Sequence, residues 1–314
     1  MSAKGKYLIS LVVPVYGVEK YIEKFAFSAL SQDFDALQFV FVNDGTTDRS
    51  MEVLGRVIDE HFAERKDDVV IVNKSNEGLP LARRTGVENS DGEYILFADS
   101  DDWLEEGAVR KVAERIRETH ADIVYFDLVK EYGGRSSYKR EKDYLDGDSR
   151  KFIINMFNYR SHGYTVTKCF RRELYTEHTV YTPPYGMHED IYLMSQIVFY
   201  ARTFSHIGEA LYHYRKDNEA SFCSQSPGTR HINSTKNMLD LYGHYREHLQ
   251  GSPIQDVWGG ILMRAGWHSI SHGYDFYGEY PYLAGDILKA PLSFNYRIGI
   301  IGQLAVKLYS LFKR

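Results

Sequence analysis

The sequence predicts an α/β fold, in which a mostly parallel sheet is flanked by helices and followed by a mainly helical C-terminal extension. Two observations predict the sheet: short apolar runs alternate with helical periodicity over the first 128 of the 314 residues, and polar turns bound each run. A third observation predicts the extension, because helical patterns dominate from about Thr229 onward.

The five apolar runs of the first part are short and rich in β-branched or aromatic residues, which is typical of buried strands. They cover residues 8–13, 39–42, 69–72, 94–98 and 123–128. Helical patterns lie between them, over roughly 19–32, 48–62, 80–89 and 107–119. Pro80 suits the first turn of its helix, because the N–H that proline lacks has no helical partner there. Strict alternation of strand and helix implies a parallel sheet with helices on both faces.

The second part of the chain has a weaker pattern. Residues 130–150 are charged and show no period, which predicts a long loop or an irregular hairpin. The elements expected beyond it are a helix over 151–159, a strand over 165–170, a helix from 188–190 to Tyr200 and a strand around 210–215. Pro253, Pro281 and Pro291 interrupt the helical pattern of the C-terminal part.

Composition narrows the class of protein. The net charge of −5 argues against a general nucleic-acid binder, which needs a basic face. Two cysteines, Cys169 and Cys223, lack the spacing of a disulfide framework or a zinc ribbon, which favours a reducing cytoplasm. No stretch reaches the roughly 18 to 20 apolar residues that cross a bilayer, and the first apolar run is too short for an export segment. We therefore expect a soluble or peripheral cytoplasmic protein.

Polar turns follow the first four predicted strands. They read PVYGVE, NDGTTD, NKSNEG and DSDDW in chain order. In open sheets of this type, ligands bind beyond the carboxyl ends of the strands. All four turns are therefore expected to face one crevice.

The turn DSDDW places three carboxylates within four positions, where their charges repel one another. Carboxylate oxygens bind hard cations such as Mg²⁺ and Mn²⁺, which commonly share their coordination with the phosphates of a substrate. Asp99 and Asp101 are therefore candidate ligands for a divalent cation bound to a diphosphate. The alternative is a turn whose aspartates cap the helix that follows Glu105.

Four segments carry a resemblance to a known family: PVYG at 14–17, VNDGTTD at 42–48, NEGLPLARRTG at 76–86 and FADSDDW at 97–103. In this order and spacing the chain resembles family 2 glycosyltransferases with the GT-A fold, over about residues 8–225. The resemblance implies transfer of a sugar from a nucleotide-sugar, with uridine favoured as the base, in bacterial surface-polysaccharide synthesis. Two departures are Gly17 and Arg84, where the family often has Asn.

The resemblance also assigns roles to side chains in the four turns. The donor-binding set is Pro14, Val15, Tyr16, Glu19, Asp44, Asn76, Arg83, Asp99, Ser100 and Arg215. In it Tyr16 stacks on the nucleobase, Asp44 accepts from the uracil edge, and Arg83 uses its fork of donors on the nucleoside and phosphates. Asp101 is the metal ligand, together with Asp99, and the implied cofactor is Mn²⁺ or Mg²⁺.

The sequence HED at 188–190 begins a predicted helix. In the resembling family the Asp of such an E-D pair removes the proton from the acceptor hydroxyl, which makes Asp190 the candidate base, with Glu189 beside it. A helix start stabilises negative charge and so keeps a base ionised. The alternative is that Asp190 is an ordinary helix cap, and the two roles can coexist.

The sequence LYHYR at 211–215 is a third candidate. On a strand alternate side chains share a face, so His213 and Arg215 are expected to point together. By resemblance His213 completes the metal shell and Arg215 binds the leaving diphosphate, while the alternative for His213 is a hydrogen-bonded residue of an edge strand. Lys168 and His188 are weaker candidates on the acceptor side.

On this reading the chain divides into a nucleotide-sugar-binding half at 1–128, an acceptor-binding half at 129–225 and a helical region at 226–314. The last region carries an apolar stripe flanked by basic residues, formed by Ile301, Leu304, Leu308 and Leu311. Such a stripe packs on its own domain or lies on an anionic membrane, which would suit a lipid-linked saccharide acceptor at the inner face of the cell membrane.

Three other functions compete with glycosyl transfer. A nucleotidyltransferase usually has a Gly-rich phosphate loop after the first strand, and PVYGVEKY is not one. A phosphatase with an aspartyl nucleophile would carry its Asp pair after an early strand, not after the fourth. The last alternative is a catalytically silent relative that binds nucleotide-sugars or scaffolds an assembly complex, against which the intact Asp99, Asp101 and Asp190 argue.

Overall fold

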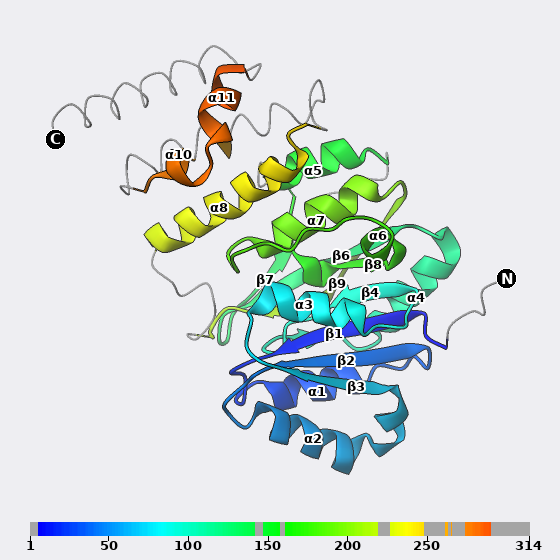
Figure 1. Ribbon diagram of the computed structural model, residues 1–314. Coiled ribbons are helices and arrows are strands. Elements are labelled where there is room, and N and C mark those ends of the chain that lie inside the picture. The colour runs from blue at the N-terminus through cyan, green and yellow to red at the C-terminus, as the bar shows by residue number, and fades with distance from the viewer. Residues whose placement is uncertain are drawn as a thin grey trace.

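The computed structural model describes residues 6–141, 147–157, 161–218, 227–247, 261–262, 265 and 274–289. Its centre is a nine-stranded sheet with helices packed on both faces (Figure 1). The strands are β1 (Ile9–Val15), β2 (Leu37–Asp44), β3 (Val69–Lys74), β4 (Tyr94–Phe97), β5 (Trp103–Leu104), β6 (Ile123–Glu131), β7 (Ser136–Lys139), β8 (Lys168–Arg171) and β9 (Phe204–Arg215). The predicted α/β class is confirmed.

The helices follow the predicted order, with ends that shift by a few residues. The α-helices are α1 (Ile22–Leu30), α2 (Ser50–His61), α3 (Leu79–Glu88), α4 (Ala108–Thr119), α5 (Ser149–Phe157), α6 (Glu173–Thr176), α7 (Glu189–Tyr200), α8 (Pro227–Tyr245), α10 (Phe276–Glu279) and α11 (Tyr282–Lys289). Short 3₁₀ turns, η1 (Ala63–Asp68) and η2 (Thr165–Thr167), precede β3 and β8. The predicted strand over 165–170 therefore begins only at Lys168.

The sheet is parallel in its first part and mixed in its second. The order is β3-β2-β1-β4-β8-β6-β9-β5, with β7 paired to β6. The strands β1 to β4 are all parallel, as predicted, but β8 runs antiparallel between β4 and β6. The predicted mostly parallel sheet therefore has a mixed second part, whose strand directions could not be predicted because an apolar pattern reports burial and carries no information about strand direction.

Two apolar cores lie on the two faces of the sheet. Helices α3, α5, α7 and α8 enclose one core, and α1, α2 and α4 enclose the other. Along β1 the side chain of Val12 enters the first core and those of Leu11 and Val13 enter the second, which is the two-residue period of a buried strand. A Cβ atom on Gly86 would lie 2.2 Å from Val12 Cγ1, so glycine lets α3 approach the sheet closely.

The predicted hairpin after β6 is formed by β6 and β7. At the other end of the chain, α8 confirms the helical pattern after Thr229, whereas the stripe from Ile301 to Leu311 lies outside the described residues.

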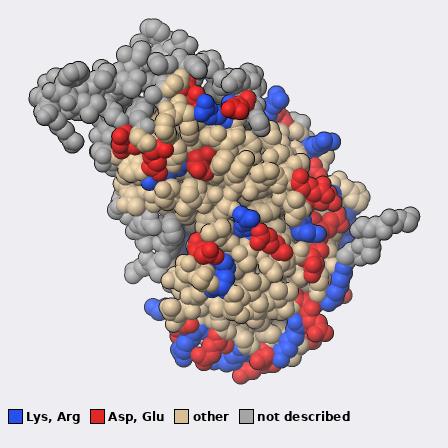
Figure 2. Space-filling model, in the orientation of Figure 1, with Lys and Arg blue, Asp and Glu red and all other residues tan. Residues whose placement is uncertain are grey.

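Among the helices of the described ranges, none combines the length and the apolar content that a bilayer crossing requires. On the face shown in Figure 2, acidic and basic side chains lie beside each other along the lower edge.

Candidate active site

The turns after β2 and β3 meet at the carboxyl edge of the parallel strands. Gly45, in the first turn, has φ of +67°, and a Cβ atom on it would lie 2.7 Å from the backbone nitrogen of Asn76. Asp44 holds the second turn, because its carboxylate accepts from the backbone N–H groups of Glu77 and Gly78 at 3.0 and 2.9 Å. Lys74 Nζ donates to the same carboxylate at 3.1 Å. Asp44 thus fixes the turn after β3 against the end of β2.

The turn after β1 is attached to the turn after β2. The backbone N–H of Gly17 donates to Thr46 Oγ1 at 2.9 Å, and that of Glu19 donates to Asp48 Oδ2 at 3.0 Å. Tyr16 lies on this turn and is 54% exposed, so its ring is available to a ligand.

Three other side chains of the predicted donor set are less available. The carboxylate of Glu19 pairs with Arg49 at 2.7 Å. Val15 and Pro14 are buried, and the carbonyl of Pro14 accepts from Ser100 Oγ at 2.8 Å. Ser100 therefore fastens the DSDDW turn to the end of β1.

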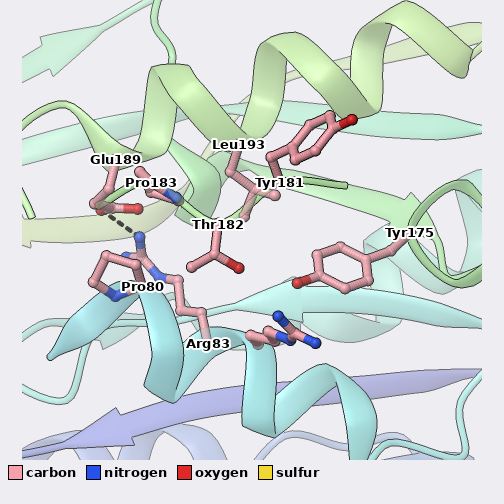
Figure 3. Close-up of a pocket in the computed structure, with 9 residues that line it drawn as sticks. Pro80, Arg83, Tyr175, Tyr181, Thr182, Pro183, Glu189 and Leu193 are labelled. Atoms are coloured by element: carbon pink, nitrogen blue, oxygen red, sulfur yellow. Dashed lines mark ion pairs between the residues drawn. The ribbon is translucent and has the colours of Figure 1, made fainter. Parts of the chain in front are cut away.

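A buried arginine joins the two acidic motifs. Arg83 of α3 is 3% exposed; its Nη2 donates to Asp99 Oδ1 at 2.8 Å, and its Nη1 pairs with Glu189 at the start of α7 (Figure 3). Burial alone would lower the pKa of Arg83, but the charges of Glu189 and Asp99 outweigh it and raise that pKa. Burial raises the pKa of Glu189 to about 7, although Arg83 opposes the shift. The distant motifs DSDDW and HED therefore share one cation.

Next to this bridge lies a small pocket between α3 and the start of α7. Its lining residues are Pro80, Arg83, Arg84, Tyr175, Tyr181, Thr182, Pro183, Glu189 and Leu193. Figure 3 shows the guanidinium of Arg83 turned toward Glu189 at one end and the ring of Tyr175 at the other.

The carboxylates of DSDDW have different partners. Asp102, 1% exposed, accepts from Tyr212 Oη at 2.8 Å and from the backbone N–H of Arg215 at 2.7 Å. Asp101 accepts from Asn218 Nδ2 at 2.8 Å. Burial raises the pKa of both Asp101 and Asp102, and neighbouring carboxylates raise it further. The turn therefore concentrates negative charge in a poorly solvated place.

Arg215 and His213 lie on the same side of β9, as the strand period predicts. Both contact Trp103: the His213 ring is stacked on it with centroids 5.0 Å apart, and the Arg215 guanidinium lies 5.2 Å from it. Arg215 Nε donates to the carbonyl of Asp101 at 2.8 Å, which places its positive charge at the DSDDW turn. His213 does not contact the DSDDW turn in the same way, because its two ring nitrogens bond to Glu105 and Glu131, at 2.7 and 2.9 Å.

The donor set of this turn suits a hard divalent cation. Asp99 and Asp101 offer carboxylate oxygens, and the raised pKa of Asp101 indicates that positive charge would be favourable there. Within the described ranges no three His, Cys, Asp or Glu side chains converge in a way that could hold a metal ion. The carboxylates of Asp99 and Asp101 alone would suit a mode in which one or two carboxylates bind Mg²⁺ or Mn²⁺ and substrate phosphates complete the shell.

The candidate base lies at the second residue of α7. Asp190 Oδ1 accepts from the backbone N–H of Ile191 at 2.8 Å, but the N-cap position belongs to His188, so Asp190 does not cap the helix. The charge of Asp190 acts on both Arg83 and Lys168. His188, the residue before the helix, has φ of +57°, a left-handed conformation that residues other than glycine rarely adopt.

Lys168 does not face the crevice. Its side chain is 0% exposed, and Nζ donates to the carbonyls of His162 and Tyr164 at 2.7 and 3.1 Å, with Glu141 at 3.7 Å. In this arrangement it holds the 162–164 loop, whose Gly163 packs against Ile191 of α7. Its connection to the acceptor side is therefore indirect.

Several residues that support the site were not identified from the sequence. They are Asp102, Tyr212, Asn218, Ser234 and Asn237. Asp102 and Tyr212 had a local signal, because they lie inside the DSDDW and LYHYR motifs, whereas Asn218, Ser234 and Asn237 lie outside these motifs.

Comparison with known proteins identifies the family that these turns belong to. A family model described as Glycosyl transferase family 2 matches residues 10–179, more than half of the chain. EpsH of Bacillus subtilis is 29% identical over 213 residues, which are 66% of this chain and 60% of EpsH. The poly(ribitol-phosphate) beta-N-acetylglucosaminyltransferase TarS of Staphylococcus aureus is 25% identical over 225 residues, which are 69% of this chain and 37% of TarS. The chain thus spans less than two thirds of the length of these relatives.

Solved structures show the same fold. The crystal structure of TarS residues 1–349 from S. aureus in complex with UDP-GlcNAc superimposes with a TM-score of 0.61 at 18% identity, covering 93% of this chain and 90% of that one. A mannosyltransferase from Pyrobaculum calidifontis in complex with GDP-Man and Mn²⁺ gives a TM-score of 0.52 at 14% identity, covering 100% of this chain and 89% of that one.

Proposed function

The chain belongs to glycosyl transferase family 2, and on that premise we propose that it is a metal-dependent, inverting glycosyltransferase. The donor is a UDP-sugar, and the acceptor is a hydroxyl group of a glycan or of a lipid-linked oligosaccharide in bacterial surface-polysaccharide synthesis. The observation that carries the proposal is the buried Arg83, because it joins Asp99 of the donor turn to Glu189, the neighbour of the candidate base. UDP-GlcNAc bound in TarS, a protein of the same fold, supports a UDP-sugar as donor.

The donor would lie along the carboxyl edge of β1 to β4. Tyr16 offers an exposed aromatic face for the uracil, whereas Asp44 is 3% exposed and would act by fixing the neighbouring turn through its bonds to the backbone N–H groups of Glu77 and Gly78. Asn76 is exposed on the neighbouring turn, within reach of the nucleoside. The diphosphate would then extend toward the DSDDW turn, where Arg215 presents a cation.

The chemistry follows from the charges at the two motifs. Asp190 accepts the proton of the acceptor hydroxyl while the hydroxyl oxygen forms a bond to the anomeric carbon. The bond from that carbon to the diphosphate oxygen breaks, and its electron pair leaves with UDP, so one displacement inverts the anomeric centre. Arg215 offsets the charge that grows on UDP. Mn²⁺ or Mg²⁺, held by Asp101 and Asp99, would supply further neutralisation of that charge.

A donor panel tests the activity. We expect UDP release from one UDP-sugar with Mn²⁺, loss of release with a chelator, and a drop of about 10²- to 10⁴-fold in kcat for Asp190→Asn. Asp59→Asn, on the exposed surface of α2, is the matched control and should keep the parent rate. Binding of UDP without turnover of any donor would instead favour the catalytically silent alternative.

The stereochemistry is tested separately. NMR of the first-formed product should show an anomeric configuration opposite to that of the donor. Retention of the donor configuration would exclude a single displacement with Asp190 as base.

A further inference from the structure

The turn that precedes α7 is held by one amide side chain of α8. Asn237 is 0% exposed, and its Nδ2 donates to the carbonyls of Tyr185 and Met187, both at 2.7 Å. Its Oδ1 accepts from the backbone N–H of Tyr185 at 3.0 Å. All three bonds are to backbone atoms, so Asn237 fixes the path of the main chain directly before the HED motif.

Two neighbours of Asn237 on α8 extend this contact along α7. Ser234 Oγ lies 2.6 Å from Nδ1 of His188, and Asp240 Oδ2 accepts from Tyr192 Oη at 2.6 Å. A spacing of three residues places these side chains and Asn237 near one face of α8. His188 lies between Glu189 and the turn that Asn237 holds. Its left-handed backbone conformation is strained, so it persists only if surrounding contacts stabilise it.

We propose that Asn237 is a positioning residue for Asp190, acting through the 185–188 turn, with Ser234 as a second support. This inference rests on the proposed function, since it takes Asp190 to be the base. Asn237 is 0% exposed and donates to both carbonyls, so its loss would leave the carbonyls of Tyr185 and Met187 without this donor in a buried place. The turn would then relax and carry the carboxylate of Asp190 away from its working position.

The inference makes α8 part of the catalytic unit. The match to the family model ends at residue 179, before the HED motif and before α8, so nothing in that match assigns a role to this helix. In Figure 1 the helix lies above α7, on the side of it away from the sheet. A misplacement of a reacting group by about 1 Å costs on the order of 10²-fold in rate, so a support of this kind can control turnover without touching substrate.

A double-mutant cycle tests the proposal, with UDP release from the donor that the panel identifies as the readout. Asn237→Asp keeps the acceptor for Tyr185 but removes the amide that donates to the two carbonyls. We expect kcat to fall by about 10- to 100-fold while the affinity for UDP with Mn²⁺ stays within about twofold. In the Asp190→Asn background the same substitution should lower kcat by less than about twofold, because there is no base left to position.

The control is Asn233→Asp, which makes the same substitution on the same helix at a residue that is only partly buried; it should keep the parent kcat. If Asn237→Asp does not yield folded protein, Ser234→Ala enters the same cycle and should show a smaller loss with the same non-additivity. Equal losses in both backgrounds, or no loss of kcat, would overturn the inference while leaving Asp190 as the base. An Asp190→Asn variant with the parent rate would overturn the proposed base as well.

Discussion

Replacement of Arg83 by methionine removes the cation shared by the two acidic motifs, and the adjacent Arg84 provides a matched control. Arg83 is 3% exposed and pairs with Asp99 and Glu189, so its loss leaves the buried carboxyl of Glu189 and the partly exposed carboxylate of Asp99 without their shared cation. Removal of one partner from a buried ion pair costs about 3–5 kcal/mol. Arg84 pairs with Glu88 one turn along α3, and both side chains are about half exposed, so Arg84→Met should cost at most about 0.5 kcal/mol.

The loss of unfolding free energy caused by Arg83→Met should also depend on pH. Burial raises the pKa of Glu189 from its ordinary value of 4.5 to about 7, so the folded parent protein holds a proton there that the unfolded chain has lost. The contribution of Glu189 to the stability of the parent therefore falls as pH rises from 4.5 to 7 and is constant above 7. Without Arg83 the pKa of Glu189 rises further, and the variant continues to lose about 1.4 kcal/mol per pH unit above that range.

Urea denaturation followed by circular dichroism measures both effects, at about pH 5, 7 and 8.5. The difference in free energy of unfolding between the parent and Arg83→Met should be smallest at the lowest pH and should grow at the highest. Equal costs for Arg83→Met and Arg84→Met, or a difference that shrinks as pH rises, would refute the argument that Arg83 neutralises Glu189.

Two further predictions concern the frame of the site. Gly45→Ala should lower the free energy of unfolding by about 1–3 kcal/mol and weaken UDP binding, because Gly45 has a left-handed φ and lies close to the backbone of Asn76. Gly55→Ala in α2, where a Cβ meets no atom within 4 Å, should be neutral or stabilising by up to about 1 kcal/mol. Thermal denaturation with and without UDP compares the two variants. Lys168→Met should lower the free energy of unfolding, measured by urea denaturation, by about 3–5 kcal/mol without changing UDP affinity. Lys66→Met, which removes an exposed ion pair, should lower it by less than about 1 kcal/mol. Equal losses would show that Lys168 has no structural role.

The order of strands and helices could be predicted because burial leaves a local period in the sequence. The apolar run at 123–128 indicates a buried strand and becomes part of β6. Its neighbours in the sheet could not be predicted, because β8 pairs with it across a segment of weak pattern and in the antiparallel direction. Pairing is decided by contacts between segments far apart in the chain, and these leave no period in either of them.

The same distinction applies to the site. The turns that carry Tyr16, Asp44 and Asp99 could be predicted, because each follows an apolar run. The helical period also contains a signal that Arg83 is buried, since Ala82, Gly86 and Val87 share its face of α3. Its partner Glu189 could not be predicted, and neither could the clamp from Asn237, because hydrogen bonds and ion pairs between distant residues have no local signature.

The partners of the three aspartates in DSDDW indicate which of them a cation would relieve most. Asp99 already has a guanidinium. Burial raises the pKa of Asp102 well above its ordinary value, but Asp102 is 1% exposed and is enclosed by a hydroxyl and a backbone N–H, which leaves no access for an ion. Asp101 receives a neutral amide from Asn218, while burial and the charge of Asp99 raise its pKa. A divalent ion at Asp101 would therefore lower the pKa of that carboxyl and reduce its repulsion with Asp99, which is the physical reason to assign the metal to the second aspartate of the motif.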